Sequence, residues 1–502
     1  MSRTLPISRL RGRARPSSSL LQLPTELQKL SSSPTSSLRH ASPSRSAWTS
    51  AIPGLSSATP FASTSTSSSL LAGSSKVALQ DPLKLLGAEM GLLRSNVQHL
   101  LGSGHPALDT IAKYYFQAEG KHVRPMLILL MSQATNGLAP GWEQRRDQAA
   151  AAELKREQGD EGLGGDDIDE PLSPPSVLND QNPSMLASAK SFFSDPLASL
   201  RPAPTPTSIA QSIHQTHLLP SQRRLAEITE MIHVASLLHD DVIDLAETRR
   251  SAPSAPSLFG NKLSILAGDF LLARASLALS RLGSNEVVEL VASVLANLVE
   301  GEVMQMKGNV PGKEGLLAGA GGGSTAKGPT PEIFDHYMKK TYLKTASLIA
   351  KSTRATTILG GCGVKQGWAE GEKVKDIAYS YGRNLGIAFQ LVDDMLDFTA
   401  SAAQLGKPGG GADLKLGLAT APALYAWEEF PELGAMIERK FAGEDDVEQA
   451  RHLISRSSGA ERTAALAAEH SKLARQALEG LPDSEARTAL DNMARDTLSR
   501  KK

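Results

Sequence analysis

The amino-acid sequence predicts an all-α protein, a helical bundle around a central cavity. Apolar residues recur at helical spacing over most of the chain, alternating strand-like segments are scarce, and Ala, Leu, Glu, Lys and Arg dominate the predicted helical faces. When the segments without this spacing are set aside, about 300 to 340 residues remain, and a bundle with a central cavity accommodates a core of that size. We therefore expect the chemistry to take place inside the cavity.

Residues 1–76 differ from the rest of the chain and are predicted to be a leader outside the folded domain. They are rich in Ser, Pro and Thr, contain seven arginines from Arg3 to Arg45, and include a single acidic residue, Glu26. Such an Arg-rich, Ser-rich and acid-poor composition is typical of an organelle transit peptide and lacks the apolar core of a secretory signal. We expect a mitochondrial protein, in the matrix or at the inner membrane; an ordinary disordered tail is the alternative.

The folded domain, in which we expect the chemistry, is predicted to span residues 77–502, with two interruptions. Helical spacing begins near Leu79. Residues 138–219 run through Asp/Glu/Gly-rich and then Pro/Ser/Thr-rich sequence, which cannot bury enough apolar surface to offset chain entropy, so we predict a disordered insertion there. Helical spacing resumes near Ser221, and residues 310–331 are predicted to form a glycine-rich loop.

The charge balance and the single cysteine narrow the function classes. The chain has 53 basic and 53 acidic residues, so no net charge favours binding to nucleic acid. Cys362 is the one cysteine, which excludes an intramolecular disulfide and a cysteine-rich zinc site and suits a reducing compartment. We see no apolar run near the roughly 18 to 20 residues that a bilayer span needs, so we expect a soluble protein or one attached to a membrane surface.

A first aspartate cluster, Asp240, Asp241 and Asp244, lies on a helix predicted from about Leu225 to Ala246. The apolar residues of this segment recur at helical spacing. Asp240 and Asp244 are four residues apart and share one face, where like charges repel at a cost that a purely structural helix has no reason to bear. A lone cluster of this kind usually marks an exposed acidic face, but here the flanks are apolar and the pattern recurs.

The second cluster, Asp393, Asp394 and Asp397, also lies in an apolar helical segment, with Gln390 one turn before Asp394. Paired carboxylates are hard ligands, and proteins hold Mg²⁺ with one or two of them together with waters and substrate phosphates. Two clusters therefore indicate several Mg²⁺ ions that clamp one diphosphate. Zn²⁺ is not expected because no Cys/His ligand set accompanies the clusters.

Basic residues at three places provide complementary charge. Lys121 and Arg124 stand at the start of a predicted helix, where amide donors and the helix dipole favour anions. Arg249 and Arg250 follow the first cluster, and Lys344 comes after the glycine-rich segment. Each alone is a common surface feature. Beside two aspartate clusters they indicate two anion pockets, one reached directly by Arg and Lys and one reached through Mg²⁺.

With these motifs the sequence resembles the trans-isoprenyl diphosphate synthases, most closely the long-chain polyprenyl diphosphate synthases that make the ubiquinone side chain in mitochondria. The matching stretches, in the family's order from Gly120 to Leu424, are GKHVRP, IHVASLLHDDVIDLAETRR, GDFLLARA, YLKTASL, FQLVDDMLDF and GKPGGGADLKLGLATAPAL. The match is specific because several separately meaningful motifs coincide. It implies the isoprenoid-synthase helical fold, Mg²⁺ as cofactor, and as substrates isopentenyl diphosphate and an allylic diphosphate, farnesyl or geranylgeranyl diphosphate.

The resemblance also implies a role for each matching residue. The diphosphate of isopentenyl diphosphate would be held by Lys121, Arg124, His233 and Arg250. The Mg²⁺ ligands would be Asp240, Asp244, Asp393 and Asp397, with Asp241 and Asp394 completing the two catalytic clusters. The allylic diphosphate would contact Arg249, Lys344, Thr345, Gln390 and Lys407. The implied reaction is a head-to-tail condensation in which an allylic carbocation forms, the isopentenyl double bond attacks it and a proton is lost, without a protein nucleophile.

The sequence departs from the family pattern at two positions. His122 stands where the family often has Arg, which would retune the diphosphate pocket. Leu418 stands where a lysine is common, and either Lys415 compensates or this branch does not need the lysine. Neither departure removes a metal ligand.

Three other classes of protein share part of this pattern. A terpene cyclase normally replaces the second aspartate cluster with an Asn/Ser/Glu triad, and a squalene-type synthase would lack GKHVRP. A noncatalytic subunit of a heteromeric synthase would be expected to have lost some of the carboxylates, yet all six are present. The family usually dimerises through helices, so we expect a homodimer or a heteromer with a related subunit.

Small residues next to the first cluster predict a long product. Ser236 precedes Asp240 by four residues, hence one turn beneath it on the face that looks down the cavity, and Ala235 is beside it. Short-chain members of the family often carry a bulky aromatic residue here, so these small residues predict about six to ten isoprene units. The alternative is that they only allow close helix packing, which leaves a shorter, geranylgeranyl-type product open.

Overall fold

The computed structural model describes residues 106–117, 122–157, 216–250, 252–307, 328–399 and 411–500, with Ile213 and single positions between 86 and 97. The leader predicted for 1–76, residues 158–212 of the predicted insertion and residues 310–327 of the glycine-rich loop lie outside this part. The long helices are α2 (Pro106–Gln117), α3 (Val123–Thr135), α4 (Trp142–Glu157), α7 (Pro220–Ile243), α9 (Asn261–Ser280), α10 (Asn285–Lys307), α12 (Pro331–Thr341), α13 (Ser347–Thr357), α14 (Gly371–Thr399), α19 (Asp446–Arg456), α20 (Gly459–Leu478) and α21 (Glu485–Leu498).

Shorter elements connect the long helices. They are α8 (Ala255–Phe259), the π-helical turns η3 (Tyr342–Ala346) and η4 (Ile358–Cys362), the 3₁₀ turn η5 (Val364–Gln366), α16 (Ala412–Lys415), α17 (Ala421–Glu429) and α18 (Leu433–Glu438). Strands in the described residues are confined to one antiparallel pair, β1 (Thr248–Arg249) and β2 (Ala252–Pro253). The all-α prediction is confirmed.

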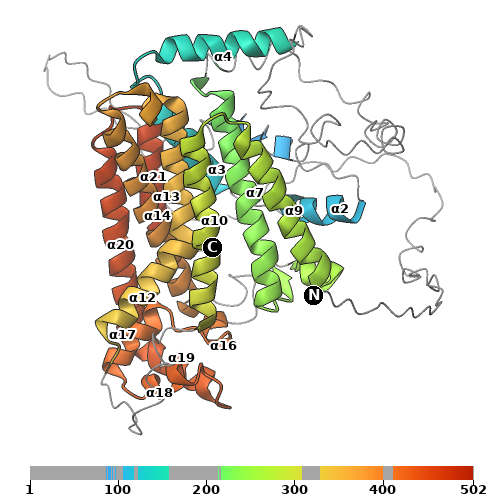
Figure 1. Cartoon of the computed structure of the whole chain (residues 1–502). Helices are drawn as coiled ribbons and strands as arrows, with labels where there is room; N and C mark the ends of the chain where they lie inside the picture. Colours follow the sequence, from blue (N-terminus) through green and yellow to red (C-terminus); the bar gives the residue numbers. More distant parts are fainter. Residues whose placement is uncertain are drawn as a thin grey trace, which may run out of the picture. The chain divides into compact units, whose positions relative to one another are not determined.

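Two apolar cores meet along α14. The larger core lies in the bundle of long helices, where α14 packs on α13 and α20 and α7 packs on α9 (Figure 1). The smaller core lies among α12, α17, α18 and the C-terminal part of α14, and it includes Leu391 and Trp427. The second aspartate cluster, near the C-terminal end of α14, therefore lies at the smaller core.

Helix α7 carries the first aspartate cluster and starts earlier than predicted. Its first residue is Pro220, whose fixed φ suits a helix start, and the Gln222 side chain accepts a hydrogen bond from the Leu219 amide at 3.1 Å. The helix ends at Ile243, three residues before the predicted end. The predicted cluster therefore lies in its last turn.

The predicted disordered insertion was wrong at its N-terminal edge. Residues 142–157 form α4, which lies across one end of the bundle (Figure 1). Trp142 is buried, and Arg145 donates a hydrogen bond to the Gly360 carbonyl at 2.9 Å, so tertiary contacts hold a segment whose composition alone favours disorder. At the other predicted break, Pro331 begins α12 rather than ending a loop.

One helix also corrects the expectation about apolar runs. Among the described residues α9 is long and apolar enough, by length and composition, to cross a membrane. In the structure α9 packs against α7 and α2 in the bundle. Its apolar character therefore has a packing reason on one side, while Ile265 and Leu266 remain exposed on the other.

Two glycines allow α14 and α10 to approach η3 closely. A Cβ at Gly386 of α14 would lie 2.6 Å from the Ala346 Cα, and a Cβ at Gly301 of α10 would lie 3.0 Å from the Lys344 backbone nitrogen. These distances are shorter than van der Waals contact, so only glycine permits them. Both approaches bring neighbouring helices onto η3, which carries Lys344 and Thr345.

Candidate active site

Both aspartate clusters lie at the C-terminal ends of their helices. Asp240 and Asp241 are in the last turn of α7 with Asp244 as its C-cap, and Asp393, Asp394 and Asp397 lie in the last two turns of α14. The negative end of a helix dipole disfavours carboxylates. Six acidic residues at two such ends therefore favour a bound cation.

Asp240 is opposed by a lysine that comes from a distorted helix. Lys344 Nζ lies 3.9 Å from Asp240 Oδ2 and 2.5 Å from Glu302 Oε2 of α10. Burial alone would lower the pKa of Lys344, but Asp240 and Glu302 outweigh it and raise that pKa above its usual value. Lys344 and Thr345 lie in the π-helical turn η3, a distortion that often occurs at functional sites.

The carboxyl groups of the first cluster are poorly compensated. Burial raises the pKa of Asp240 to about 7, with Glu302 and Asp244 adding to the rise and Lys344 opposing it. Burial also raises the pKa of Asp244. A cation in place of the proton would stabilise such carboxyl groups, as expected of metal ligands.

The second aspartate of the first cluster is buried and fully paired. Asp241 is fully buried and accepts hydrogen bonds from Arg249 Nε at 2.8 and 2.9 Å, from Arg249 Nη2 at 2.5 Å and from the Tyr115 hydroxyl. Arg249, predicted to contact the allylic diphosphate, is therefore paired with this carboxylate in the structure. Asp241 therefore links the end of α7 to Tyr115 of α2 and to Arg249.

The second aspartate of the second cluster is buried and paired as well. Asp394 is 4% exposed and accepts hydrogen bonds from the Tyr337 hydroxyl at 2.6 Å and from Gln390 Nε2 at 2.7 Å. Thr345 Oγ1 in turn donates to Gln390 Oε1 at 2.7 Å, so two predicted substrate contacts form one chain of hydrogen bonds that ends on Asp394. This chain ties η3 to α14.

The outer aspartates of α14 have different partners. Asp393 lies 3.1 Å from Nη1 of Arg500, a residue near the C-terminus whose guanidinium also lies over the Phe389 ring. Asp397 accepts the backbone N–H groups of Ala412 and Asp413 at 3.2 and 3.1 Å, one on each oxygen. Each carboxylate oxygen has two lone pairs, so Asp397 keeps the capacity to bind a cation.

Three basic residues, His233, Arg124 and Arg250, lie near one another. Burial, and then the charges of Arg124 and Arg250, lower the pKa of His233 well below its usual value, so the ring is neutral and can donate one hydrogen bond. Burial lowers the pKa of Arg124 as well, against the influence of Glu230 and Asp393. Arg250 adopts a left-handed conformation, φ 51°, in the turn after β1. Basic residues from α3, α7 and this turn thus lie close enough to influence one another's charge.

Of the predicted site residues, Lys121 and Lys407 lie outside the described part of the chain. The structure adds Glu302, Tyr115, Tyr337, Lys340 and Arg500, which no motif had indicated. Lys340 is buried, and burial lowers its pKa against the charges of Asp394 and Asp413, so it lies near the second cluster. Little in the sequence gives reason to select these residues, because a single Tyr or Arg outside a motif is usually a packing or surface residue.

The carboxylates fit a divalent cation of the Mg²⁺ type. Every candidate ligand on the two helices is an oxygen, as hard cations require. In the part of the chain that the structure describes, no three acidic, His or Cys residues converge tightly enough to enclose a metal ion by themselves. An open arrangement of this kind suits ions that keep waters and substrate phosphates as most of their ligands.

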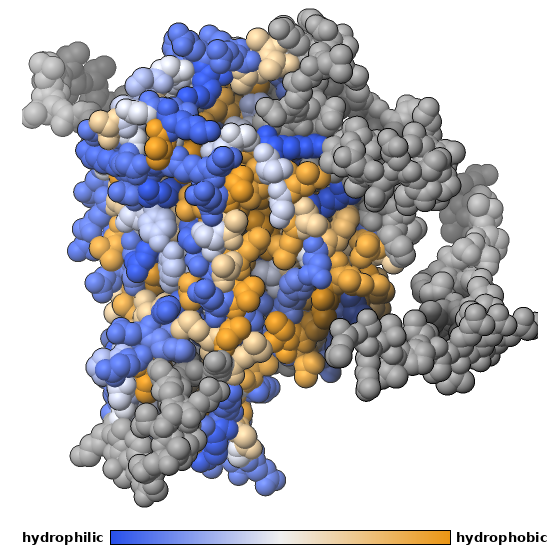
Figure 2. Space-filling view, in the orientation of Figure 1, coloured by the Kyte–Doolittle hydropathy of each residue, from blue (hydrophilic) through white to orange (hydrophobic). Residues whose placement is uncertain are grey.

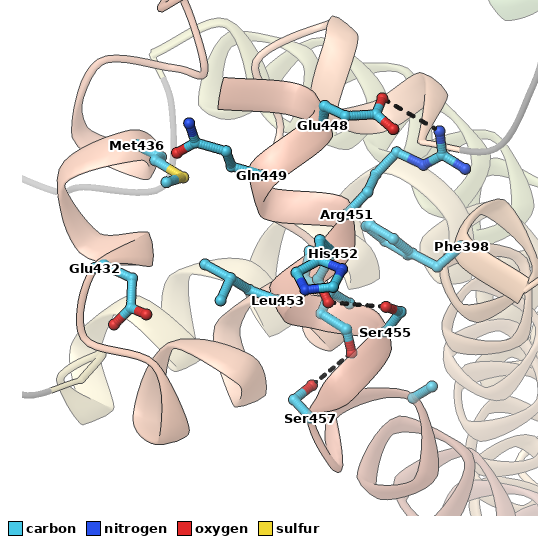
Figure 3. A pocket seen from close by; sticks show the side chains of 12 residues that line it. Phe398, Glu432, Met436, Glu448, Gln449, Arg451, His452, Leu453, Ser455 and Ser457 are labelled. Atoms are coloured by element: carbon cyan, nitrogen blue, oxygen red, sulfur yellow. Dashed lines mark hydrogen bonds and ion pairs between the residues drawn. The ribbon is translucent and has the colours of Figure 1, made fainter. Parts of the chain in front are cut away.

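A separate cavity lies next to the end of α14, where its lining residue Phe398 directly follows Asp397 of the second cluster. It has a volume of about 910 Å³ and is lined by Phe398 of α14, Met436 of α18, and residues of α19 that include Gln449 and His452 (Figure 3). Its charged side chains Glu448 and Arg451 lie 3.8 Å apart. None of the predicted site residues lines it, so we place the chemistry at the clusters.

The raised pKa of Asp240 leads to a testable prediction for the metal-free protein. This carboxyl binds its proton more tightly in the folded state than in the unfolded state, where its pKa is near the usual 3.8. The free energy of unfolding should therefore fall as the pH rises from about 4 to about 7. Asp240→Asn should therefore raise the free energy of unfolding at pH 7.5 by on the order of 2 kcal/mol. Urea unfolding with a chelator present measures it, and equal pH dependence in both proteins would contradict the prediction.

Comparison with known proteins agrees with the chemistry of the site. Residues 190–454 match the family model described as "Polyprenyl synthetase". A "Probable hexaprenyl pyrophosphate synthase, mitochondrial" from Neurospora crassa is 51% identical, covering 84% of this chain and 82% of the relative. "Decaprenyl-diphosphate synthase subunit 1" from Schizosaccharomyces pombe is 40% identical, covering 83% of this chain and 91% of the relative.

A solved structure gives the same result. The polyprenyl synthase from Caulobacter crescentus, crystallised with calcium and isoprenyl diphosphate, is similar with a TM-score of 0.56 and 25% identity, covering 84% of this chain and 97% of that one. The predicted isoprenoid-synthase fold and prenyltransferase activity are confirmed, and the mitochondrial location is confirmed by the fungal relative's name. The chain belongs to the polyprenyl synthetase family.

Proposed function

We propose that this protein extends an allylic diphosphate by successive head-to-tail addition of isopentenyl diphosphate, with Mg²⁺, to a long-chain polyprenyl diphosphate of about C30 to C50. One observation carries this proposal: two carboxylate clusters at helix ends lie beside a separate basic pocket, which matches a reaction with two diphosphate substrates. Relatives with hexaprenyl and decaprenyl products support the chain length.

The residues divide the work by charge. Arg124, His233 and Arg250 would bind the diphosphate of isopentenyl diphosphate by direct hydrogen bonds. Asp240, Asp244, Asp393 and Asp397 would hold Mg²⁺, which when bound neutralises charge on the allylic diphosphate and stabilises it as a leaving group. Lys344 would donate to the same leaving diphosphate from η3, since its raised pKa keeps it protonated.

The proposal predicts a direct result. Purified protein lacking residues 1–76, incubated with farnesyl diphosphate, isopentenyl diphosphate and Mg²⁺, should give a product of about six to ten isoprene units, measured by mass spectrometry. Omission of Mg²⁺ should abolish it. A product that stops at four units would contradict the long-chain assignment, and no elongation with or without a related subunit would contradict the enzyme assignment.

We propose in addition that the functional unit is a dimer of this chain through α9 and α10. Large apolar side chains on these helices remain exposed: Ile265, Leu266, Val299, Val303 and Met306. Figure 2 shows hydrophobic residues gathered over this side of the bundle, while the α20 side is mostly hydrophilic. A contiguous apolar face of this kind marks an interaction surface. A second copy offers the same face, as a two-fold interface requires.

Light scattering after gel filtration tests the dimer. The wild-type protein should have twice the mass of one chain, and Val299→Lys together with Val303→Lys should give monomers. Leu473→Lys on α20, where the leucine is also exposed, is the matched control and should stay dimeric. A wild-type protein that is monomeric alone and pairs only with a different subunit would contradict the homodimer.

A further inference from the structure

The two aspartate clusters are anchored in the same way by tyrosines from distant helices. Tyr115 of α2 donates its hydroxyl hydrogen to Asp241, and the same oxygen accepts the backbone N–H of Ala255 at 2.9 Å. Tyr337 of α12 donates to Asp394 at 2.6 Å and also has a hydrogen bond from the backbone of Ala421. Ala255 and Ala421 are the first residues of α8 and α17, and each is followed by proline.

Each tyrosine thus links the middle aspartate of one cluster to the beginning of another helix. The four side chains are buried: Tyr115 is 7% exposed, Tyr337 and Asp241 are 0%, and Asp394 is 4%. Burial leaves no water to replace a lost donor, so each carboxylate depends on its protein partners. The parallel is not a sequence repeat, because Tyr115 precedes Asp241 by 126 residues and Tyr337 precedes Asp394 by 57.

A fixed middle aspartate determines where its neighbours point. In a helix, residues one before and three after a given position project from adjoining faces, so holding Asp241 against Tyr115 orients Asp240 and Asp244 together. The same geometry relates Asp394 to Asp393 and Asp397. Ligand groups must be held within about 0.5 Å and 10–20° of their working geometry, and buried hydrogen bonds beyond the ligands provide that constraint.

We propose that Tyr115 and Tyr337 are positioning residues that orient the outer aspartates of the two clusters for Mg²⁺ and diphosphate. The inference rests on the proposed function for the identity of the bound group. Neither tyrosine is required to touch substrate. Both hydroxyls act as donors, and burial raises the pKa of each above its usual value, which keeps the hydrogen in place.

The test compares three Tyr→Phe substitutions that each remove one buried hydroxyl and keep the ring. Tyr115→Phe and Tyr337→Phe break the two links. Tyr381→Phe is the control, because Tyr381 is fully buried on α14 and its hydroxyl donates to the Leu490 carbonyl at 2.9 Å, away from both clusters. Circular dichroism and thermal unfolding establish that each variant folds; if one of the first two does not, the other link carries the test.

The primary measurement is binding of inorganic diphosphate at several Mg²⁺ concentrations by titration calorimetry, which needs no turnover. Tyr115→Phe and Tyr337→Phe should weaken Mg²⁺-dependent diphosphate binding about 10-fold. They should raise the KM for the allylic diphosphate similarly while changing the KM for isopentenyl diphosphate less than about 2-fold, because the basic pocket is separate. Tyr381→Phe should alter stability alone.

The proposal is overturned if Tyr115→Phe and Tyr337→Phe bind Mg²⁺ and diphosphate as Tyr381→Phe does, or if both KM values rise equally. Failure of the proposed function looks different: the wild-type protein would then bind Mg²⁺ with diphosphate but not elongate a prenyl chain. The binding measurement therefore separates an error about the tyrosines from an error about the reaction.

Discussion

Asp240→Asn should lower kcat/KM for the allylic diphosphate by at least about 100-fold, with little change in overall fold. The substitution keeps the size of the side chain and removes the charge that opposes Lys344 and would bind the cation. Removing one preorganised charge at a developing leaving group typically costs this much or more. Steady-state kinetics at saturating Mg²⁺ measures it.

The control for this prediction lies on the helix that carries the other cluster. Asp376→Asn on α14 removes an aspartate whose side chain is 71% exposed and pairs with Arg354. Exposed ion pairs contribute little, so activity and stability should stay near wild type. Activity of Asp240→Asn within about threefold of Asp376→Asn would contradict a role for Asp240 in catalysis.

Asp240→Asn should also separate activity from stability. The same change that removes catalysis relieves a buried, partly protonated carboxyl and should stabilise the metal-free protein. Active sites commonly store such unfavourable charge because function requires it. A variant that is both less active and less stable would indicate that Asp240 supports the fold instead.

Ser236→Phe should shorten the product to about four isoprene units or fewer. Ser236 lies four residues before Asp240, about 6 Å along the axis of α7, so a ring there would meet the chain soon after the first additions. The Ser236 hydroxyl donates to the His233 carbonyl of its own helix at 2.8 Å, so no other element depends on it. Mass spectrometry of the products measures the result.

The structure selects Ser236 over Ala235 for this experiment. Ala235 is fully buried in the bundle core, so a phenylalanine there would overpack it and confuse loss of fold with loss of length. Ser236 is only partly buried, so a larger side chain there should disturb the core less. Ser236→Ala removes the hydroxyl but keeps the side chain small, so it should leave product length unchanged if side-chain size is what matters. An unchanged product distribution in Ser236→Phe would place the growing chain elsewhere.

The sequence by itself determined the fold class and the positions of the two clusters. Helical spacing, apolar flanks and like charges four residues apart are local features, and local features can be recognised without knowledge of tertiary partners. The basic residues Arg124 and Arg250 were predictable for the same reason, because each lies in a short motif of its own. Composition also misled locally: the segment at α4 looked disordered, and contacts through Trp142 and Arg145 hold it as a helix.

Tertiary structure alone decided what holds the middle aspartate of each cluster in place. The sequence and its resemblance named the outer aspartates of each cluster as metal ligands, but only the structure shows Asp241 and Asp394 buried against Tyr115 and Tyr337. These partners are 126 and 57 residues away along the chain, and no spacing rule connects residues that meet only through folding. The pKa of Asp240 depends in the same way on burial and on Glu302 from another helix. A hydrogen bond or a desolvated charge is a property of the packed site, which is why the sequence could predict the ligands but not their supports.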